Sequence, residues 1–506
     1  MSDSGSLRAR IQSGVAWKAG SQVTLQLTRM IVALVLARLL APHDWGLAAM
    51  VLVFSGFAVV FTDNALGTAL IQRRELNEDD RSTVFWASAG VGLVLAVLGV
   101  VLAGPLASFY EEPDVRWLFV ALSGGFVVSS LGTTQMALLV REMEFRKLEL
   151  RLIAATLVGA ALGLWLAFAG YGAWAIVGQL LGEAVTSTVL LWFLTAWRPS
   201  LRFSTTSVRK LGGFAGNVFA ENVLWQGGRT VATVVIGRVL GAAALGTYAL
   251  ATTVILMPFT RIAAPLQQVF FPAFSQLCDD RERMADIWIR ATRLIGAISI
   301  PALVGLVVVA PDFVQVVLGS KWNDVTPVIQ ILALVGVIQS IHTLNAEVLL
   351  ALDRVGTLLA YTVLWVAATV CAVAVGVRWD IVGVAACYAV ATILVEPVRA
   401  YITTQALGIP VSRFVRSLSG VAQATAAMAA ALLAARAALL AADVPTIVRL
   451  VLLILLGAIV YTAASLWRVR EVTDEVRGVL GHRRAAPARL SIRSRKGSSS
   501  TETDVI

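Results

Sequence analysis

Long apolar stretches alternate with short polar or glycine- and proline-containing connections along this chain. A helix needs roughly 20 apolar residues to cross a hydrocarbon core of about 30 Å, and each stretch has about that length. The pattern predicts an all-α integral membrane protein with about fourteen transmembrane helices. The predicted spans are 14–40, 44–70, 83–108, 115–140, 150–169, 172–196, 212–240, 244–271, 286–310, 323–350, 356–377, 381–404, 415–440 and 446–467.

Basic residues gather in alternate connections, which indicates the orientation of the chain. The connections of the other set contain Lys321 and Arg378 as their basic residues. Cytoplasmic connections of membrane proteins are enriched in Lys and Arg, so we expect both termini in the cytoplasm. The basic residues of the predicted cytoplasmic set are Arg73, Arg74, Arg81, Arg141, Arg146, Lys147, Arg151, Arg198, Arg202, Arg209, Lys210, Arg281, Arg283, Arg354, Arg413 and Arg416.

Composition supports lipid rather than water as the solvent of most of the chain. Of the 506 residues, 58% are hydrophobic and 14% charged, which is far from the balance of a soluble domain. The net charge of +10 is concentrated partly in a tail at 468–506 that is rich in Arg and Ser. We expect this flexible basic tail to lie near anionic membrane lipids, and we predict no nucleic-acid partner.

An internal repeat organises the predicted helices. Sliding the chain by 200 residues aligns the helix pair at 14–70 with the pair at 212–271. Apolar matches are expected by chance in such a chain, whereas matched arginines and glutamines are not. The matched polar and glycine positions are Gln26/Gln226, Arg29/Arg229, Arg38/Arg238 and Gly46/Gly246.

The repeat predicts two six-helix lobes related by a pseudo-twofold axis. An even number of spans returns the chain to the same side, so the two repeats are parallel, and substrate is expected between them. Two C-terminal helices follow the lobes. The predicted divisions are an N-lobe at 1–197, a cytoplasmic linker at 198–211, a C-lobe at 212–404, two appended helices at 405–467 and the tail at 468–506.

Ionisable residues inside the spans are candidate binding groups, because each costs roughly 2.5–3.5 kcal/mol at the membrane centre. Arg29, Arg229 and Arg261 lie in the middle of spans and predict a cationic cavity that binds an anion. Internal pairing or snorkelling to the interface is the alternative. Further candidates in the cavity are Lys18, Asp63, Glu221 and Asn222, while Arg290 and Arg293 are candidates for an entrance or for lipid-headgroup contacts.

Signatures of enzymes are absent from the sequence. It contains no phosphate-binding glycine loop followed by lysine, no HExxH motif and no GxSxG motif. We therefore expect a transporter rather than an enzyme, with no catalytic residue, no metal site and no cofactor.

Three segments resemble the polysaccharide flippases of the multidrug/oligosaccharidyl-lipid/polysaccharide exporter superfamily, in the branch that serves exopolysaccharide and lipopolysaccharide biosynthesis. The segments are ARLLAPHDWGLAAM (37–50), DNALGTALIQRRELNEDDRSTVFW (63–86) and ALLVREMEFRKLEL (137–150). The resemblance implies alternating access around a central cavity lined by the helices at 14–40, 44–70, 212–240 and 244–271.

The substrate implied by the resemblance is an oligosaccharide on undecaprenyl pyrophosphate, turned from the inner to the outer leaflet of the bacterial cytoplasmic membrane. Polysaccharide polymerases and glycosyltransferases of the same pathway are the implied partners. Related lipid II flippases hold pyrophosphate with arginines of the first, second and eighth helices. Arg29 and Arg261 match two of these, but the second helix has Asp63 and Asn64, so Arg229 must substitute.

Two other functions stay open at this point. A cation-coupled drug or metabolite antiporter of the same superfamily needs acidic residues, which Asp63 and Glu221 could supply. A membrane polysaccharide polymerase or ligase is the enzymatic alternative, and it is expected to have a large extracytoplasmic loop. For a flippase we expect the membrane potential or an ion gradient as the energy source, since outward movement of one negative charge gains about 2.3 kcal/mol per 100 mV.

Overall fold

The protein is a helical membrane protein that crosses the bilayer many times. The computed structural model describes residues 21–22, 24–62, 70, 77–202 and 216–468. These residues form helices and contain no β-strand. Nine helices of this described part are long and apolar enough to cross a membrane. The all-α membrane fold predicted from hydropathy is therefore confirmed.

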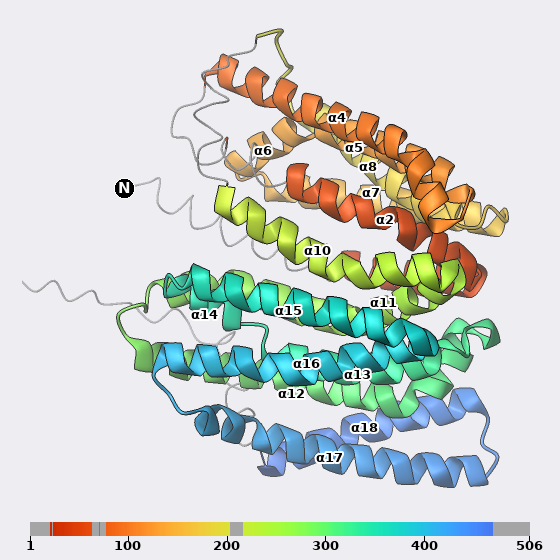
Figure 1. Cartoon of the computed structure of the whole chain (residues 1–506), viewed down its shortest axis with the longest axis vertical. Helices are drawn as coiled ribbons and strands as arrows, with labels where there is room; N and C mark the ends of the chain where they lie inside the picture. The colour runs from red at the N-terminus through yellow and green to blue at the C-terminus, as the bar shows by residue number, and fades with distance from the viewer. Residues whose placement is uncertain (1–20, 23, 63–69, 71–76, 203–215, 469–506) are drawn as a thin grey trace, which may run out of the picture.

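Over the residues that the structure describes, each predicted span coincides with one helix or with a helix broken once (Figure 1). The first half contains helical residues 24–39, α2 (Pro42–Thr62), α4 (Glu78–Tyr110), α5 (Asp114–Ser130), α6 (Thr133–Arg141), α7 (Phe145–Phe168) and α8 (Trp174–Leu194). The second half contains α10 (Gly216–Val239), α11 (Gly241–Ser275), α12 (Arg281–Phe313), η1 (Val314–Leu318), η2 (Ser320–Trp322), α13 (Val325–Ile341), α14 (Asn345–Ala351), α15 (Val355–Gly376), η3 (Val377–Trp379) and α16 (Asp380–Leu407), followed by α17 (Val411–Ala441) and α18 (Thr446–Arg468).

The two halves have helix breaks and turns at corresponding positions. The repeat therefore extends beyond the helix pairs in which the sequence predicted it. The fourth span is broken in each half, between α5 and α6 and between α13 and α14. The turn that follows has a residue with positive φ in each half, Met143 at 57° and Asp353 at 55°. A W-x-I-V-G pattern then lies at the start of the sixth span, at 174–178 and at 379–383.

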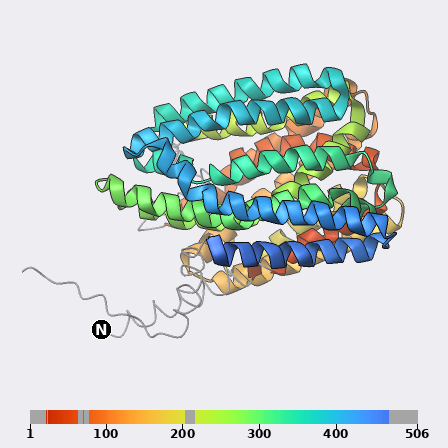
Figure 2. The same cartoon turned by 90° about the horizontal axis from the view of Figure 1, so that it is seen from below.

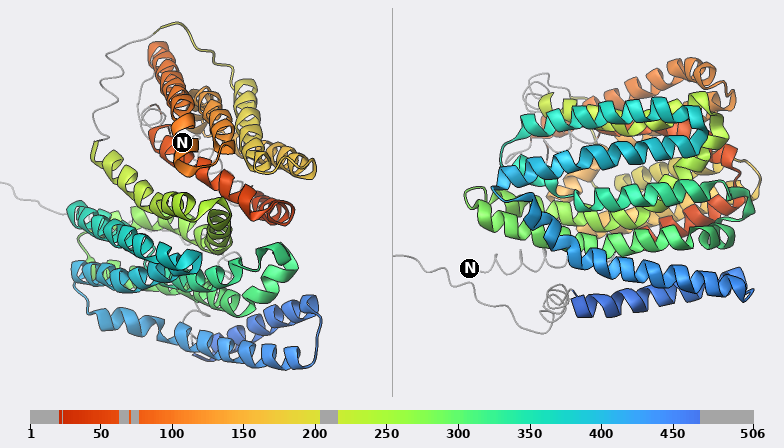
Figure 3. Two further views of the ribbon diagram at one scale, coloured as in Figure 1. Left: turned by 45° about the vertical axis from the view of Figure 1, so that its right-hand side comes forward. Right: turned by 60° about the horizontal axis from the view of Figure 1, so that its bottom comes forward.

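The helices form two groups that meet along α2, α10 and α11 (Figure 1). Helices α4, α5, α7 and α8 lie on one side of this seam and α12 to α16 on the other. The two groups lie close together at one end of the molecule and diverge towards the opposite end, as the left view of Figure 3 shows. We call the end where they meet the closed end. The proposed linker at 198–211 overlaps residues 203–215, which lie outside the described residues.

The closed end contains two close backbone contacts between α2 and α11, and the internal repeat relates one contact to the other. A Cβ atom on Gly46 of α2 would overlap the carbonyl oxygen of Ala242 in α11, and one on Gly246 of α11 would overlap that of Pro42. Residues 42 and 46 correspond to 242 and 246 under the offset of 200. The two contacts are therefore equivalent, as a pseudo-twofold axis between α2 and α11 requires. Glycine lets the two backbones touch because it has no side chain.

Arginines at corresponding positions bridge the two groups beside this contact. Arg38 donates a hydrogen bond from Nη1 to the carbonyl oxygen of Val316, at 2.9 Å. Its repeat partner Arg238 forms an ion pair of 2.9 Å with Glu111, at the end of α4. Both arginines thus reach from one half of the molecule to the end of the third span of the other half.

Replacing Glu111 with glutamine is expected to cost little stability, because the Arg238–Glu111 pair is open to solvent. The Arg238 and Glu111 side chains are 42% and 70% exposed. Exposed ion pairs contribute about 0.2–1 kcal/mol, so the free energy of unfolding should fall by at most about 1 kcal/mol. Denaturant unfolding of the purified protein measures it, with Glu142→Gln as an exposed control. A loss several times larger contradicts this account of the pair.

Helices α17 and α18 lie along α12 at the outer side of the second group (Figure 2). A buried charge cluster joins the three helices. Asp312 of α12 is 1% exposed and accepts hydrogen bonds from Nε of Arg436 at 3.0 Å and from Nε of Arg449 at 2.8 Å. Nη2 of Arg449 adds a second contact to the same carboxylate, at 2.5 Å. One carboxylate thus anchors both C-terminal helices.

Candidate functional site

A cavity of about 830 Å³ lies along the seam between the two groups of helices. Its walls come from α2, α10 and α11 and also from α13, α14, α15 and α16. The resemblance predicted walls from the first, second, seventh and eighth spans. The second, seventh and eighth do line the cavity. Among the described residues, those of the first span instead line a neighbouring cavity of about 220 Å³, with Ala33 and Leu36.

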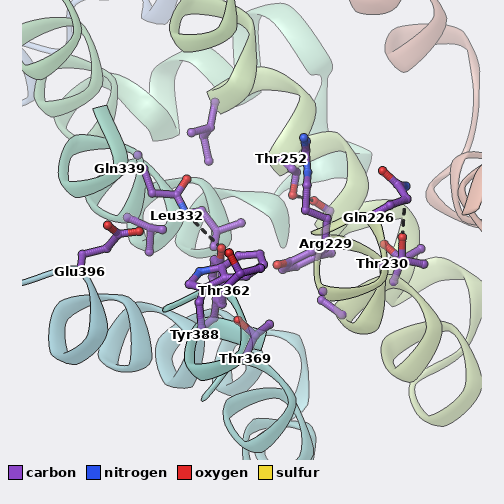
Figure 4. A pocket seen from close by; sticks show the side chains of 18 of the residues that line it. Gln226, Arg229, Thr230, Thr252, Leu332, Gln339, Thr362, Thr369, Tyr388 and Glu396 are labelled. Carbon is purple, nitrogen blue, oxygen red and sulfur yellow. Dashed lines mark hydrogen bonds between the residues drawn. The ribbon is translucent and has the colours of Figure 1, made fainter. Parts of the chain in front are cut away.

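Polar side chains line the cavity on two sides. Arg229 and Thr230 of α10 lie on one side and Glu396 of α16 on the other, with Tyr388 and Thr362 between them (Figure 4). The Tyr388 hydroxyl accepts a hydrogen bond from the Gln339 side chain at 3.0 Å. The cavity is therefore amphipathic, with apolar surface from α2 and α13 and polar groups from α10, α15 and α16.

The two arginines that the repeat matches have different surroundings. Nη2 of Arg29 forms an ion pair of 2.5 Å with Glu183 of α8, and the hydroxyl of Thr156 donates to the same carboxylate oxygen at 3.0 Å. Arg29 thus shows the internal pairing that the sequence had left open as the alternative. Arg229 is exposed on the cavity, and no carboxylate of the described residues pairs with it. Among the described residues that line the cavity, Arg229 is therefore a cation without a paired carboxylate and is available to a ligand.

The difference arises because the repeat changes residue type on the sixth span. Aligning the W-x-I-V-G patterns pairs Glu183 of α8 with Tyr388 of α16, each five residues after the glycine. The first half therefore has a carboxylate where the second half has a phenol. A phenol is neutral at physiological pH and does not neutralise an arginine. The substitution leaves Arg229 as a cation in the cavity wall, whereas Arg29 is compensated.

The other predicted binding residues are not tested by the structure. Lys18 and Asp63 lie outside the described residues. Glu221 and Asn222 fall in α10 and Arg261 in α11, at positions whose side chains are outside the described part. The predicted entrance residues both lie in α12, where Arg290 is exposed and Arg293 is half-buried, and neither lines the cavity. All these roles stay predictions.

Two charged residues of the cavity escaped the sequence analysis. Glu396 and Arg399 lie one helical turn apart in α16 with 4.0 Å between their charged atoms, and both line the cavity. An acidic and a basic residue spaced i, i+3 inside an apolar span are a signal in their own right, because membrane helices rarely contain ionisable residues without a function. This i, i+3 charge pair in the predicted span 381–404 could have identified α16 as a wall of the cavity.

The arrangement suits a large ligand that is both anionic and polar. One uncompensated arginine can hold a phosphate-type anion by charge-assisted hydrogen bonds. The remaining threonine, tyrosine and glutamine side chains offer neutral hydrogen bonds. The apolar part of the wall matches the hydrocarbon part of a lipid.

A family model described as "Polysaccharide biosynthesis protein" matches residues 35–327. This range is more than half of the chain. The chain belongs to this family of polysaccharide biosynthesis proteins. The matched range includes the seam helices α2, α10 and α11 and the cavity residues that these helices contribute.

Curated relatives are similar over about two thirds of the chain. "Lipopolysaccharide biosynthesis protein WzxC" of Escherichia coli is 32% identical over 352 residues, which are 69% of this chain and 72% of that protein. "Teichuronic acid biosynthesis protein TuaB" of Bacillus subtilis is 25% identical over 69% of this chain and 73% of its own length. "Succinoglycan biosynthesis transport protein ExoT" of Rhizobium meliloti is 28% identical over 64% of this chain and 66% of its own length.

Solved structures share the fold at low sequence identity. The lipid II flippase MurJ in an inward closed conformation superposes with a TM-score of 0.71 at 15% identity, covering 89% of this chain and 100% of MurJ. An inward-facing multidrug transporter of the MATE family superposes with a TM-score of 0.58 at 13% identity, covering 77% of this chain and 98% of its own. The polysaccharide biosynthesis protein described here therefore has the fold of these membrane transporters.

Proposed function

We propose that the protein is a flippase for a lipid-linked oligosaccharide. Its substrate is an oligosaccharide repeat unit on undecaprenyl pyrophosphate, which it moves from the inner to the outer leaflet of the bacterial cytoplasmic membrane. The observation that supports this most strongly is Arg229, an arginine that no described carboxylate pairs with, in a cavity of about 830 Å³ between two lobes. The relatives named for lipopolysaccharide, teichuronic acid and succinoglycan biosynthesis support a polysaccharide precursor as the substrate.

Transport proceeds by alternating access in this proposal. The pyrophosphate enters the cavity and binds Arg229, while the polyprenyl chain stays in lipid. The two lobes then rock relative to each other, so that the contact of α2 with α11 separates and the closed end opens outward. The alternation of basic connections supports an orientation with both termini in the cytoplasm. The membrane potential favours outward movement of the anionic headgroup and can supply energy.

No covalent chemistry is part of this proposal, and no cofactor is needed. Polymerases and glycosyltransferases of the pathway are the proposed partners on either side of the transport step.

A cation-coupled antiporter is less well supported, because Arg399 lies beside the cavity carboxylate Glu396. Incubation with lipid-linked oligosaccharide should leave its glycan length unchanged by mass analysis, and a lengthened glycan favours the polymerase alternative instead.

Replacing Arg229 with glutamine is expected to slow transport by about 10- to 100-fold. A hydrogen bond to a charged group contributes about 1.5–3 kcal/mol, and 1.4 kcal/mol corresponds to a factor of ten. The measurement is translocation of a fluorescent undecaprenyl-pyrophosphate oligosaccharide in proteoliposomes. Arg378→Gln is the matched control, because Arg378 is exposed and lies outside the cavity. Wild-type transport by the Arg229 variant contradicts the proposed binding of the anion.

A further inference from the structure

Three polar side chains of α15 and α16 form a cluster in the cavity wall. Tyr361 is 4% and Glu396 is 3% exposed, and the Arg399 side chain is 13% exposed. The Arg399 guanidinium lies over the Tyr361 ring, 5.3 Å from the ring centre. All three residues line the cavity, and in Figure 4 Glu396 lies on the side away from Arg229. The cluster is therefore separate from the cation on α10.

Each member of this cluster has a buried polar atom for which no described protein residue meets full hydrogen-bond geometry, although the Tyr361 hydroxyl and the Glu396 carboxylate lie near each other. These atoms are the Tyr361 hydroxyl, Oε2 of Glu396 and Nε of Arg399. The distance of 4.0 Å between Arg399 and Glu396 is too long for a hydrogen bond. Buried polar groups are nearly always paired, because an unpaired one costs free energy. Three of them on one wall of a cavity indicate groups positioned for a ligand.

The charges around the cluster argue against an anion as that ligand. Glu396 compensates Arg399 within one turn of α16, and Glu347 of α14 has a further charge interaction with Arg399. The cluster thus has no excess of positive charge. An anionic group is better placed at Arg229, where no carboxylate of the described residues is paired with the arginine. The cluster suits an uncharged group with several hydroxyls.

Aromatic surface beside the cluster narrows the class of ligand further. Tyr361, Trp365 and Tyr388 all line the same cavity. Rings present flat apolar faces, while the carboxylate accepts hydrogen bonds and the guanidinium donates them. A sugar ring offers the complement of this set, since it combines apolar C–H faces with hydroxyls that donate and accept.

We propose that Tyr361, Glu396 and Arg399 form a subsite for the neutral sugar portion of the substrate, distinct from the anion site at Arg229. This inference rests on the proposed function, because it divides one lipid-linked oligosaccharide between two parts of one cavity. The hydroxyl of Tyr361 and the carboxylate of Glu396 bind sugar hydroxyls, and Arg399 donates to ring or glycosidic oxygens. The second lobe thereby distinguishes a glycosylated lipid from a bare one.

Binding of two probes by the purified full-length protein in nanodiscs tests this division. The probes are undecaprenyl pyrophosphate without sugar and undecaprenyl pyrophosphate bearing a neutral tetrasaccharide, and tryptophan fluorescence reports binding. Tyr361→Phe and Glu396→Gln should each weaken binding of the glycosylated probe about tenfold and leave the bare probe unchanged. Arg229→Gln should weaken binding of both. Tyr401→Phe, at an exposed position of α16, is the matched control.

The outcomes separate the subsite from the proposed function. If the wild type binds both probes and the two cluster variants weaken neither or both equally, the sugar subsite is overturned while the flippase proposal stands. If the wild type binds neither probe, both proposals are overturned. Tyr361→Phe removes one oxygen and keeps the ring, so the gel-filtration profile of this variant should match that of the wild type. Weaker binding of the glycosylated probe alone then reports lost recognition of the sugar rather than misfolding.

Discussion

Replacing Gly246 with alanine is expected to reduce transport by about 5- to 100-fold. Any Cβ atom at this position overlaps the Pro42 carbonyl oxygen, which is backbone and cannot rotate away. Overpacking of this kind costs about 1–3 kcal/mol, and 3 kcal/mol changes the ratio of two conformations by about 100-fold. The conformation with the closed end shut is the one destabilised, so alternation between the two states should fail. Gly46→Ala should have the same effect through Ala242.

Two measurements check this expectation. Transport of the fluorescent lipid-linked oligosaccharide in proteoliposomes gives the rate. Labelling of Thr252→Cys by a membrane-impermeant maleimide, in a background with the native cysteines replaced by serine, reports access to the cavity from outside. Labelling should increase in the Gly246 variant. Gly104→Ala in α4 is the control, because a Cβ atom there meets no other atom within 4 Å. Unchanged transport and labelling contradict the role given to this contact.

Replacing Asp312 with alanine should destabilise the protein by about 3–5 kcal/mol. The change leaves Arg436 and Arg449 facing each other without a carboxylate, and Arg449 is 8% exposed. Removing one partner of a buried ion pair costs this much because an uncompensated charge stays buried. Loss of the anchor should also detach α17 and α18 from α12. Chemical unfolding in detergent, followed by circular dichroism, measures the change in free energy.

A charge-free version of this cluster separates charge from packing. Replacing Asp312 with alanine together with Arg436→Met and Arg449→Met should recover most of the lost stability, since buried ion pairs can be exchanged for apolar residues at little cost. Asp324→Ala is the control, because Asp324 is exposed at the N-cap position of α13 and makes no side-chain cap. An Asp312 variant as stable as the wild type shows that the cluster does not anchor the two helices.

The sequence predicted the order of helices well because whether a segment spans the membrane depends on that segment's own residues. A span must be apolar over about 20 residues whatever it packs against, so each of the predicted stretches coincides with a helix in the described residues. The offset of 200 residues also predicted a real symmetry. Gly46 and Gly246 occupy equivalent places in one contact between α2 and α11. The matched arginines and glutamine stood out because charged and strongly polar residues are costly in apolar spans.

The cavity could be predicted only in part, because its charges depend on neighbours that are remote in the sequence. Arg29 and Arg229 look alike in the repeat, yet Arg29 pairs with Glu183, which is 154 residues away. Likewise, Asp312 is 124 residues from Arg436 and 137 from Arg449. Hydropathy contains no information about which helix faces touch. The contributions of α15 and α16 to the cavity were missed for the same reason.

By itself the sequence determined that this protein is a bundle of membrane helices with a twofold repeat and arginines inside its spans. These properties follow from the energetic cost of placing each residue in lipid, which is set residue by residue. Only the tertiary structure decided which arginine is compensated, which helices line the cavity and how α17 and α18 are held. Those properties are set by pairs of side chains on different helices, since the free energy of a buried charge depends on the partner that the fold brings to it.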